Sequence, residues 1–221
     1  MLNVEGLCKS FGERSLWSDL SFSVAPGTMA AITGRSGTGK TTLLNCLGAI
    51  DHPSSGSIWW KGEDLCTLSE RRRRLLRRRD LGYLFQDYAL VDNESADTNI
   101  GFAVTPPWPW ARKKFPRQLA RVGLEDIGSR PVYQLSGGEQ QRVAMARVLA
   151  KQPTLVLADE PTGALDEKSG EVVVSLLREL ADDGAVVVIA THQDSVRLAC
   201  DEWLDLDAMA SLAGSEDRHS D

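Results

Sequence analysis

A glycine-rich run that ends in a lysine and a threonine, GRSGTGKT at residues 34–41, has the pattern of a phosphate-binding loop. The glycines allow consecutive backbone N–H groups to curve around phosphate oxygens, and a helix expected to begin near Lys40 points the positive end of its dipole at the same place. Lys40 supplies a positive charge for the β- and γ-phosphates, and the Thr41 hydroxyl suits Mg²⁺. The predicted phosphate site comprises Gly34, Arg35, Ser36, Gly37, Thr38, Gly39, Lys40, Thr41 and Thr42.

Two carboxylates end a second apolar run, LVLADE at 155–160. Asp159 can hold a water on Mg²⁺, and Glu160 beside it can polarise an attacking water as general base. Two acids that merely end a strand are the alternative. The phosphate loop in the same chain favours the catalytic interpretation.

A third segment, YQLSGGEQQR at 133–142, has the features of another anion site. Ser136, Gly137, Gly138 and Glu139 directly precede the apolar periodicity of a helix. A hydroxyl, bare N–H groups and a helix N-terminus bind an anion without a charged side chain. The chain therefore has two predicted anion sites, and the ligand of the second has to be explained.

Strands and helices alternate around these segments. Apolar runs rich in β-branched residues predict buried strands, and 3.6-residue periodicity predicts helices between them. The expected strands are 29–33, 81–85, 154–158 and 185–190, and the expected helices are 40–50, 138–151 and 167–180. This order predicts an α/β fold with a mainly parallel sheet, and alternation in the opening third predicts an antiparallel edge layer. Prolines and the lack of a long strand predict a helical subdomain at 87–150, inserted in a core formed by 1–86 and 151–221.

Composition restricts the class of protein. The 221 residues are 42% hydrophobic, which is enough for a buried core. The net charge of −6 gives no general basic surface, so we expect no nucleic-acid partner. No apolar window reaches 18 residues and Glu5 interrupts the N-terminus, so we expect neither a membrane span nor a signal peptide. The four cysteines lack metal-site spacing and predict reduced thiols.

In their order along the chain, these segments resemble the nucleotide-binding subunit of an ATP-binding cassette (ABC) transporter. GRSGTGKT resembles the Walker A loop of that family, LVLADE the Walker B strand, and LSGGEQQR at 135–142 the signature motif. The resemblance runs from about Val4 to about Asp207, nearly the whole chain.

Four further residues take on roles through this resemblance. Phe11 stands where an aromatic side chain stacks on adenine, and Gln86 where the Q-loop glutamine takes part in catalysis and metal binding. Asp166 ends the D-loop GALD, and His192 is the switch histidine. Ordinary core packing is the alternative for Phe11, and capping a strand is the alternative for His192.

The resemblance also answers the question of the second anion site. It implies a head-to-tail homodimer, in which Ser136, Gly137, Gly138 and Glu139 of one chain contact the ATP held by the Walker A loop of the other. Mg²⁺ would be held by Thr41, Gln86 and Asp159. The resemblance further implies a cytoplasmic ATPase that is peripheral on the inner face of the membrane and bound to a separate transmembrane permease.

A finer resemblance is to the ATPases of macrolide and peptide exporters, lipoprotein release and cell-division complexes. Within this group, LGYLFQDYALVDNESADTNI at 81–100 looks most like exporters of bacteriocins of the lactococcin 972 type. The alternatives are a soluble ABC ATPase that acts on ribosomes or DNA, and a transmembrane signalling ATPase of the cell-division type. Two departures stand out, a proline-rich run at 104–118 and Gln193 where relatives commonly have Asp.

An arginine-rich segment, ERRRRLLRRRD at 70–80, does not belong to these motifs. Leu68, Leu75 and Leu76 predict one apolar stripe on a helix whose remaining faces carry the arginines. A solvated face, contact with anionic lipid headgroups and contact with an acidic segment of the permease remain as interpretations of Arg71 to Arg79.

Overall fold

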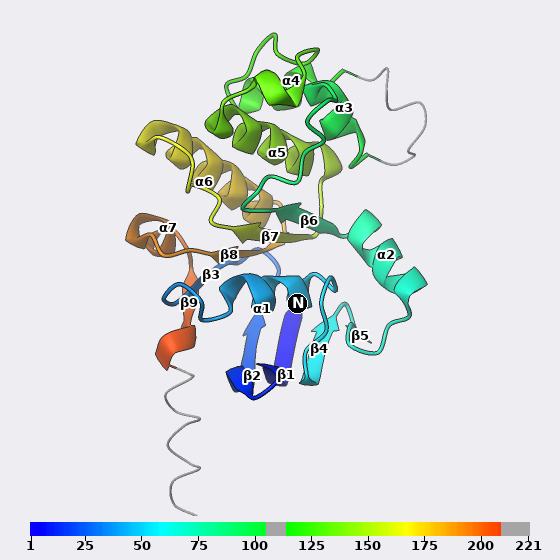
Figure 1. The fold of residues 1–221 in the computed structure, drawn as a ribbon, viewed down its shortest axis with the longest axis vertical. Helices are drawn as coiled ribbons and strands as arrows, with labels where there is room; N and C mark the ends of the chain where they lie inside the picture. Colours follow the sequence, from blue (N-terminus) through cyan, green and yellow to red (C-terminus); the bar gives the residue numbers. More distant parts are fainter. Residues whose placement is uncertain (105–113, 209–221) are drawn as a thin grey trace, which may run out of the picture.

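Two β-sheets lie on either side of one helix in the computed structural model, which describes residues 1–104 and 114–208 (Figure 1). The larger sheet is parallel, with the strand order β6-β7-β8-β3-β9. Its strands are β3 (Met29–Thr33), β6 (Leu81–Leu84), β7 (Leu155–Asp159), β8 (Val186–Ala190) and β9 (Glu202–Asp205). Every residue of β6, β7 and β8 is buried, as expected for a parallel sheet covered on both faces. The sequence predicted all of these strands except β9, which is short, mostly exposed and lies at the sheet edge.

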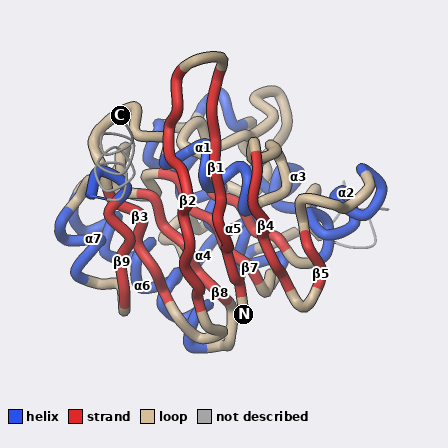
Figure 2. The backbone as a smooth tube through the Cα atoms, turned by 90° about the horizontal axis from the view of Figure 1, so that it is seen from below, coloured by secondary structure: helices blue, strands red, loops and turns tan. Residues whose placement is uncertain are grey.

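The smaller sheet is antiparallel, with the order β2-β1-β4-β5, and confirms the predicted edge layer (Figure 2). Its strands are β1 (Leu2–Phe11), β2 (Arg14–Val24), β4 (Ser55–Trp60) and β5 (Glu63–Asp64). Alternate residues of β1 point into the core, so one face of this sheet is apolar. The hairpin between β1 and β2 carries Phe11 to the end of this layer.

The helices cover both faces of the parallel sheet. They are α1 (Lys40–Leu47), α2 (Glu70–Arg79), α3 (Ala96–Gly101), α4 (Pro116–Arg121), α5 (Gly137–Lys151), α6 (Glu167–Asp182) and α7 (Asp194–Leu198), with a 3₁₀ turn at Val132–Gln134. The helices α3 and α4 pack on α5 in the part of the chain between β6 and β7. The domain bounds set at 86, 87, 150 and 151 stay a prediction, and residues 105–113 of the proline-rich run lie outside the described residues.

Two apolar cores follow from the strand alternation. In β8, Val186 and Val188 face a core shared with α1 and the antiparallel sheet. Val187 and Ile189 face the opposite core, shared with α5 and α6. The parallel strands lie between the two cores, and the loops at their carboxyl ends carry most of the predicted site residues.

The predicted apolar stripe on α2 was partly wrong. Leu76 is buried, but Leu75 is 42% exposed and the second fully buried residue is Arg73, at 1%. Residues 73 and 76 are three apart and therefore share one face, whereas Leu75 is turned away from it. The Arg73 guanidinium donates to the Leu65 carbonyl at 3.2 Å, and its Nη1 lies 3.2 Å from Nδ1 of His52.

The substitution Arg73→Ala should lower the free energy of unfolding by about 2–3 kcal/mol, because it leaves the buried Leu65 carbonyl without its charged donor. Arg74→Ala, on the exposed side of the same helix, should change it by less than about 0.5 kcal/mol. Urea unfolding of the two variants measures both values. Equal losses would show that Arg73 has no special structural role.

Candidate functional site

A cleft of about 950 Å³ opens where the strands of the parallel sheet end. The loop after β3, Gln86 after β6, Glu160 after β7 and His192 after β8 all line it. The carboxyl ends of parallel strands are the usual place for a ligand in an α/β sheet. The predicted residues that line the cleft are Phe11, Gly34, Arg35, Ser36, Gly37, Gly39, Lys40, Thr41, Thr42, Gln86, Asp159, Glu160 and His192.

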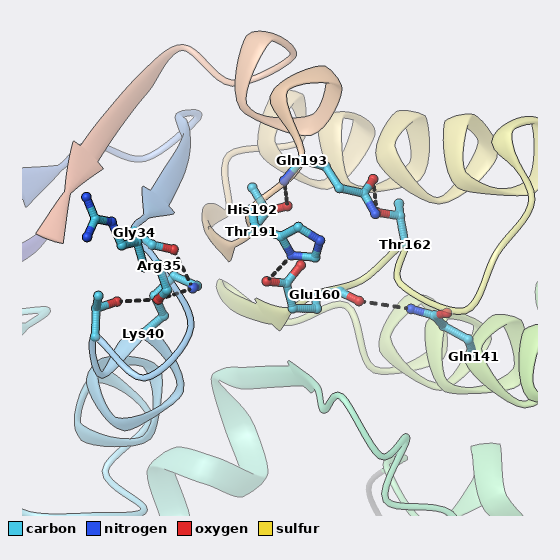
Figure 3. Close-up of polar contacts among 10 residues, drawn as sticks. Gly34, Arg35, Lys40, Gln141, Glu160, Thr162, Thr191, His192 and Gln193 are labelled. Carbon is cyan, nitrogen blue, oxygen red and sulfur yellow. Dashed lines mark hydrogen bonds and ion pairs between the residues drawn. The ribbon is translucent and has the colours of Figure 1, made fainter. Parts of the chain in front are cut away.

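The loop between β3 and α1 has a backbone that only glycine accommodates easily. Gly39 has φ of 95°, and a Cβ atom there would lie 2.8 Å from Nε1 of the buried Trp17. Lys40 begins α1 and folds back over the loop, where its Nζ donates to the carbonyls of Gly34 at 2.7 Å and Arg35 at 3.1 Å (Figure 3). The loop thus curves around the Lys40 ammonium group, an arrangement suited to phosphate binding. Thr38 lies outside the residues that line the cleft, and its hydroxyl donates to the Arg35 carbonyl.

Asp159 and Thr41 form an oxygen pair at the base of the cleft. Burial raises the pKa of Asp159, although a hydrogen bond from the Thr41 hydroxyl and the charge of Lys40 oppose the rise. A carboxylate and a hydroxyl are hard oxygen donors that fit Mg²⁺. Within residues 1–104 and 114–208, no three His, Cys, Asp or Glu side chains gather as a metal site. A magnesium ion with few protein ligands, completed by water and phosphate, matches this donor set.

Glu160 has an unusual backbone and an engaged side chain. Its φ is 47°, in the left-handed region, and Gln141 of α5 donates to the carbonyl of the following Pro161. Its Oε1 lies 2.8 Å from Nδ1 of His192, and Figure 3 shows the carboxylate turned toward that ring. Its Oε2 is buried and has no hydrogen-bond partner among the described residues. One carboxylate oxygen is therefore held by His192, and the other is buried without a partner.

The signature segment does not line this cleft. Ser136 is the N-cap of α5, and its hydroxyl accepts from the Glu139 N–H. The Glu139 carboxylate accepts from the Ser136 N–H at 2.8 Å and from its hydroxyl at 2.9 Å, which lowers the pKa of Glu139. Ser136, Gly137, Gly138 and Glu139 are not among the described residues that line the cleft. A single chain thus keeps its two predicted anion sites apart.

Two further predicted residues have clear positions. Asp166 caps α6, where its carboxylate accepts from the N–H and the hydroxyl of Ser169, and it lines a separate cavity of about 530 Å³. Phe11 is 56% exposed, and Nζ of Lys9 lies 4.8 Å from its ring centroid. The core interpretation of Phe11 is therefore wrong, and its ring is open to a ligand.

Several residues of the cleft were not named as site residues. Gln141 belongs to the predicted signature motif LSGGEQQR, and Gly163 and Ala164 belong to the predicted D-loop GALD, whereas Arg14, Leu16 and Tyr88 had no assigned role. Gln141 left a signal in the sequence, because it is a polar residue on the apolar face of α5 and is only 5% exposed. Arg14 and Leu16 reach the cleft through the β1–β2 hairpin, which no local pattern places beside the phosphate loop.

The curved glycine loop before α1, together with a buried Asp and a Glu at the end of a neighbouring strand, defines a P-loop nucleoside triphosphatase. A family model described as "ABC transporter" matches residues 17–163. The chain belongs to the ABC transporter family and is an ATP-binding cassette of it. The prediction of the family from its motifs is confirmed.

Individual relatives agree with this assignment. The lipoprotein-releasing system ATP-binding protein LolD of Shewanella oneidensis is 40% identical over 92% of this chain and 92% of its own length. The export ATP-binding/permease proteins PvdT of Pseudomonas entomophila and MacB of Nitrosomonas europaea are 45% and 41% identical, and the matches span only 28% and 31% of their lengths. Among solved structures, the dimeric ATP-binding cassette MJ0796 bound to ADP and Pi superposes with a TM-score of 0.86 at 31% identity, over 93% of this chain and 94% of that one.

Proposed function

We propose that the chain is the ATP-hydrolysing subunit of an export-type transporter and works as a head-to-tail homodimer on a separate permease. One observation carries the proposal, namely that the Ser136 segment, which we infer to be an anion site, begins α5 outside the residues that line the cleft. A second copy in head-to-tail orientation would bring its Ser136 segment to the first copy's cleft. The related cassette MJ0796 is dimeric, which supports a dimer of this chain.

The residues of the cleft would divide the work of binding ATP. The loop N–H groups and Lys40 would hold the phosphates, and the exposed ring of Phe11 would stack on adenine. Asp159 and Thr41 would hold Mg²⁺, which when bound would supply positive charge against the phosphates. Gln86, which lines the cleft directly after β6, would contribute to the same magnesium site.

The contact between Glu160 and His192 would organise hydrolysis. Glu160 lines the cleft with its Oε1 2.8 Å from Nδ1 of His192, and its carboxylate would accept a proton from an attacking water. Gln141 donates to the Pro161 carbonyl and would thereby hold the backbone that positions the Glu160 carboxylate beside His192. His192 has a side chain that is 67% exposed, and it can reach the γ-phosphate from the end of β8.

The class of cargo follows from the relatives only in outline. Their names include macrolide export, pyoverdine export and lipoprotein release. We therefore propose an export function for this chain and no particular cargo. The closer likeness to bacteriocin exporters stays a prediction of the sequence. None of the helices in the described part of the chain is both long and apolar enough to cross a membrane. We propose that a permease holds the chain on the inner face of the membrane.

A pull-down of the Glu160→Gln form from solubilised membranes of the native host, with ATP and Mg²⁺, tests the proposal. Mass spectrometry should find a membrane protein that is absent from a matched pull-down without ATP or with Lys40→Ala. Recovery of ribosomal or DNA-repair proteins without a membrane protein would contradict the transporter function and favour a soluble ABC ATPase.

A further inference from the structure

One face of α2 carries exposed arginines without partners. Arg71, Arg74, Arg78 and Arg79 are exposed, and none of them forms a hydrogen bond or ion pair with another described residue. Leu75 lies among them and is 42% exposed. Positions 71, 74, 75, 78 and 79 follow the i, i+3, i+4, i+7, i+8 spacing of one helical face. We call this set the arginine face.

The other arginines of α2 have partners inside the molecule. Arg72 pairs with Glu63 of β5, Arg73 is buried, and Arg77 donates to the Ala49 carbonyl at 2.6 Å. The arginine face is therefore the part of α2 whose cations have no partner among the described residues.

The arginine face carries a cost within the chain. Like charges at i,i+3 and i,i+4 spacing, such as Arg71 with Arg74 and Arg74 with Arg78, destabilise a helix. The helix dipole disfavours a cation at Arg71 in the first turn, whereas it favours Arg78 and Arg79 in the last turn. The chain has 31 acidic residues and a net charge of −6, yet none of the described acids neutralises this face. The charge of this face is therefore left without a partner in the described part of the chain.

We propose that the arginine face binds the anionic headgroups of a phospholipid bilayer directly, independently of the permease. The helix lies at the edge of the molecule and stands out from both sheets, so its outer face is convex (Figures 1 and 2). A fluid headgroup layer can adapt to a convex face, whereas a folded acidic partner would need a matching hollow. Four guanidinium groups around an exposed Leu75 match an anionic interface, in which the leucine enters the boundary of the acyl chains.

Sedimentation of the full chain with vesicles tests the proposal. Wild-type protein should bind vesicles of phosphatidylcholine mixed with phosphatidylglycerol, should ignore phosphatidylcholine alone, and should be released by salt. The double variant Arg74→Gln/Arg78→Gln should bind about 30-fold more weakly, at about fivefold for each arginine. The matched control Arg117→Gln/Lys168→Gln removes two exposed cations from α4 and α6 and should bind as wild type.

Two results would overturn the proposal. One is equal vesicle binding by wild type and Arg74→Gln/Arg78→Gln. The other is a wild-type protein that does not prefer anionic vesicles but binds a soluble polyglutamate peptide, while Arg74→Gln/Arg78→Gln does not bind that peptide. This result would assign the face to an acidic protein segment. Both variants should hydrolyse ATP like wild type, because the arginine face does not line the cleft. If the wild-type protein did not hydrolyse ATP, the result would contradict the proposed function and would leave the lipid-binding proposal unaffected.

Discussion

Glu160→Gln should lower ATP turnover by about 10²- to 10³-fold and leave the affinity for ATP unchanged. The amide has nearly the same shape as the carboxylate and can keep its contact with Nδ1 of His192. It cannot take a proton from water, and this is the step that we assign to the Glu160 carboxylate in the cleft. The phosphate contacts come from the loop and Lys40 and are not touched by the substitution.

Steady-state phosphate release and titration with a fluorescent ATP analogue measure the two quantities separately. Glu125→Gln is a matched control, because Glu125 is exposed and lies outside the residues that line the cleft. A Glu160→Gln protein that hydrolyses ATP at the wild-type rate would place the general base elsewhere. A variant that instead loses ATP affinity would show that Glu160 acts in binding.

Local chemistry explains why so much of the phosphate site was predictable. Glycines at 34, 37 and 39 adopt positive φ, and Lys40 begins a helix directly after them, so one short run encodes both the loop and its charge. The buried strands were predictable for a similar reason, because unbroken apolar runs fit only a sheet that is covered on both faces. Residues that act within their own segment could therefore be assigned from the sequence.

Contacts between distant segments could not be predicted in the same way. The Glu160–His192 contact depends on the pairing of β7 with β8, and Arg14 reaches the phosphate loop only because a hairpin folds over it. Arg73 was misjudged because the usual preference of arginine for solvent is overridden by the Leu65 carbonyl and His52. In each case the partner that determines the side chain's position belongs to another element, outside the short stretch of sequence from which a helix or strand is predicted.

Ser136→Arg should abolish ATP-dependent dimerisation and lower turnover by about 10²-fold, while each monomer still binds ATP. The serine hydroxyl and N–H groups at the start of α5 are the donors proposed to meet the partner's γ-phosphate. A long side chain at this N-cap occupies the space that the nucleotide needs, and the loss of the cap costs only about 1 kcal/mol of stability. Ser129→Arg, at another exposed serine, should dimerise normally. Sizing by light scattering with ATP, in the Glu160→Gln background that preserves bound nucleotide, measures dimerisation.

Mixing variants separates a shared site from a site within one chain. Ser136→Arg keeps an intact phosphate loop, and Lys40→Ala keeps an intact Ser136 segment. In a head-to-tail dimer of one of each, one composite site has both parts intact, whereas neither variant alone can form such a site. ATP should therefore produce a heterodimer from the mixture and no dimer from either protein alone. If the mixture stays monomeric, or if Ser136→Arg dimerises by itself, the Ser136 segment does not contact the nucleotide of a partner. Its capping box would then serve only to begin α5.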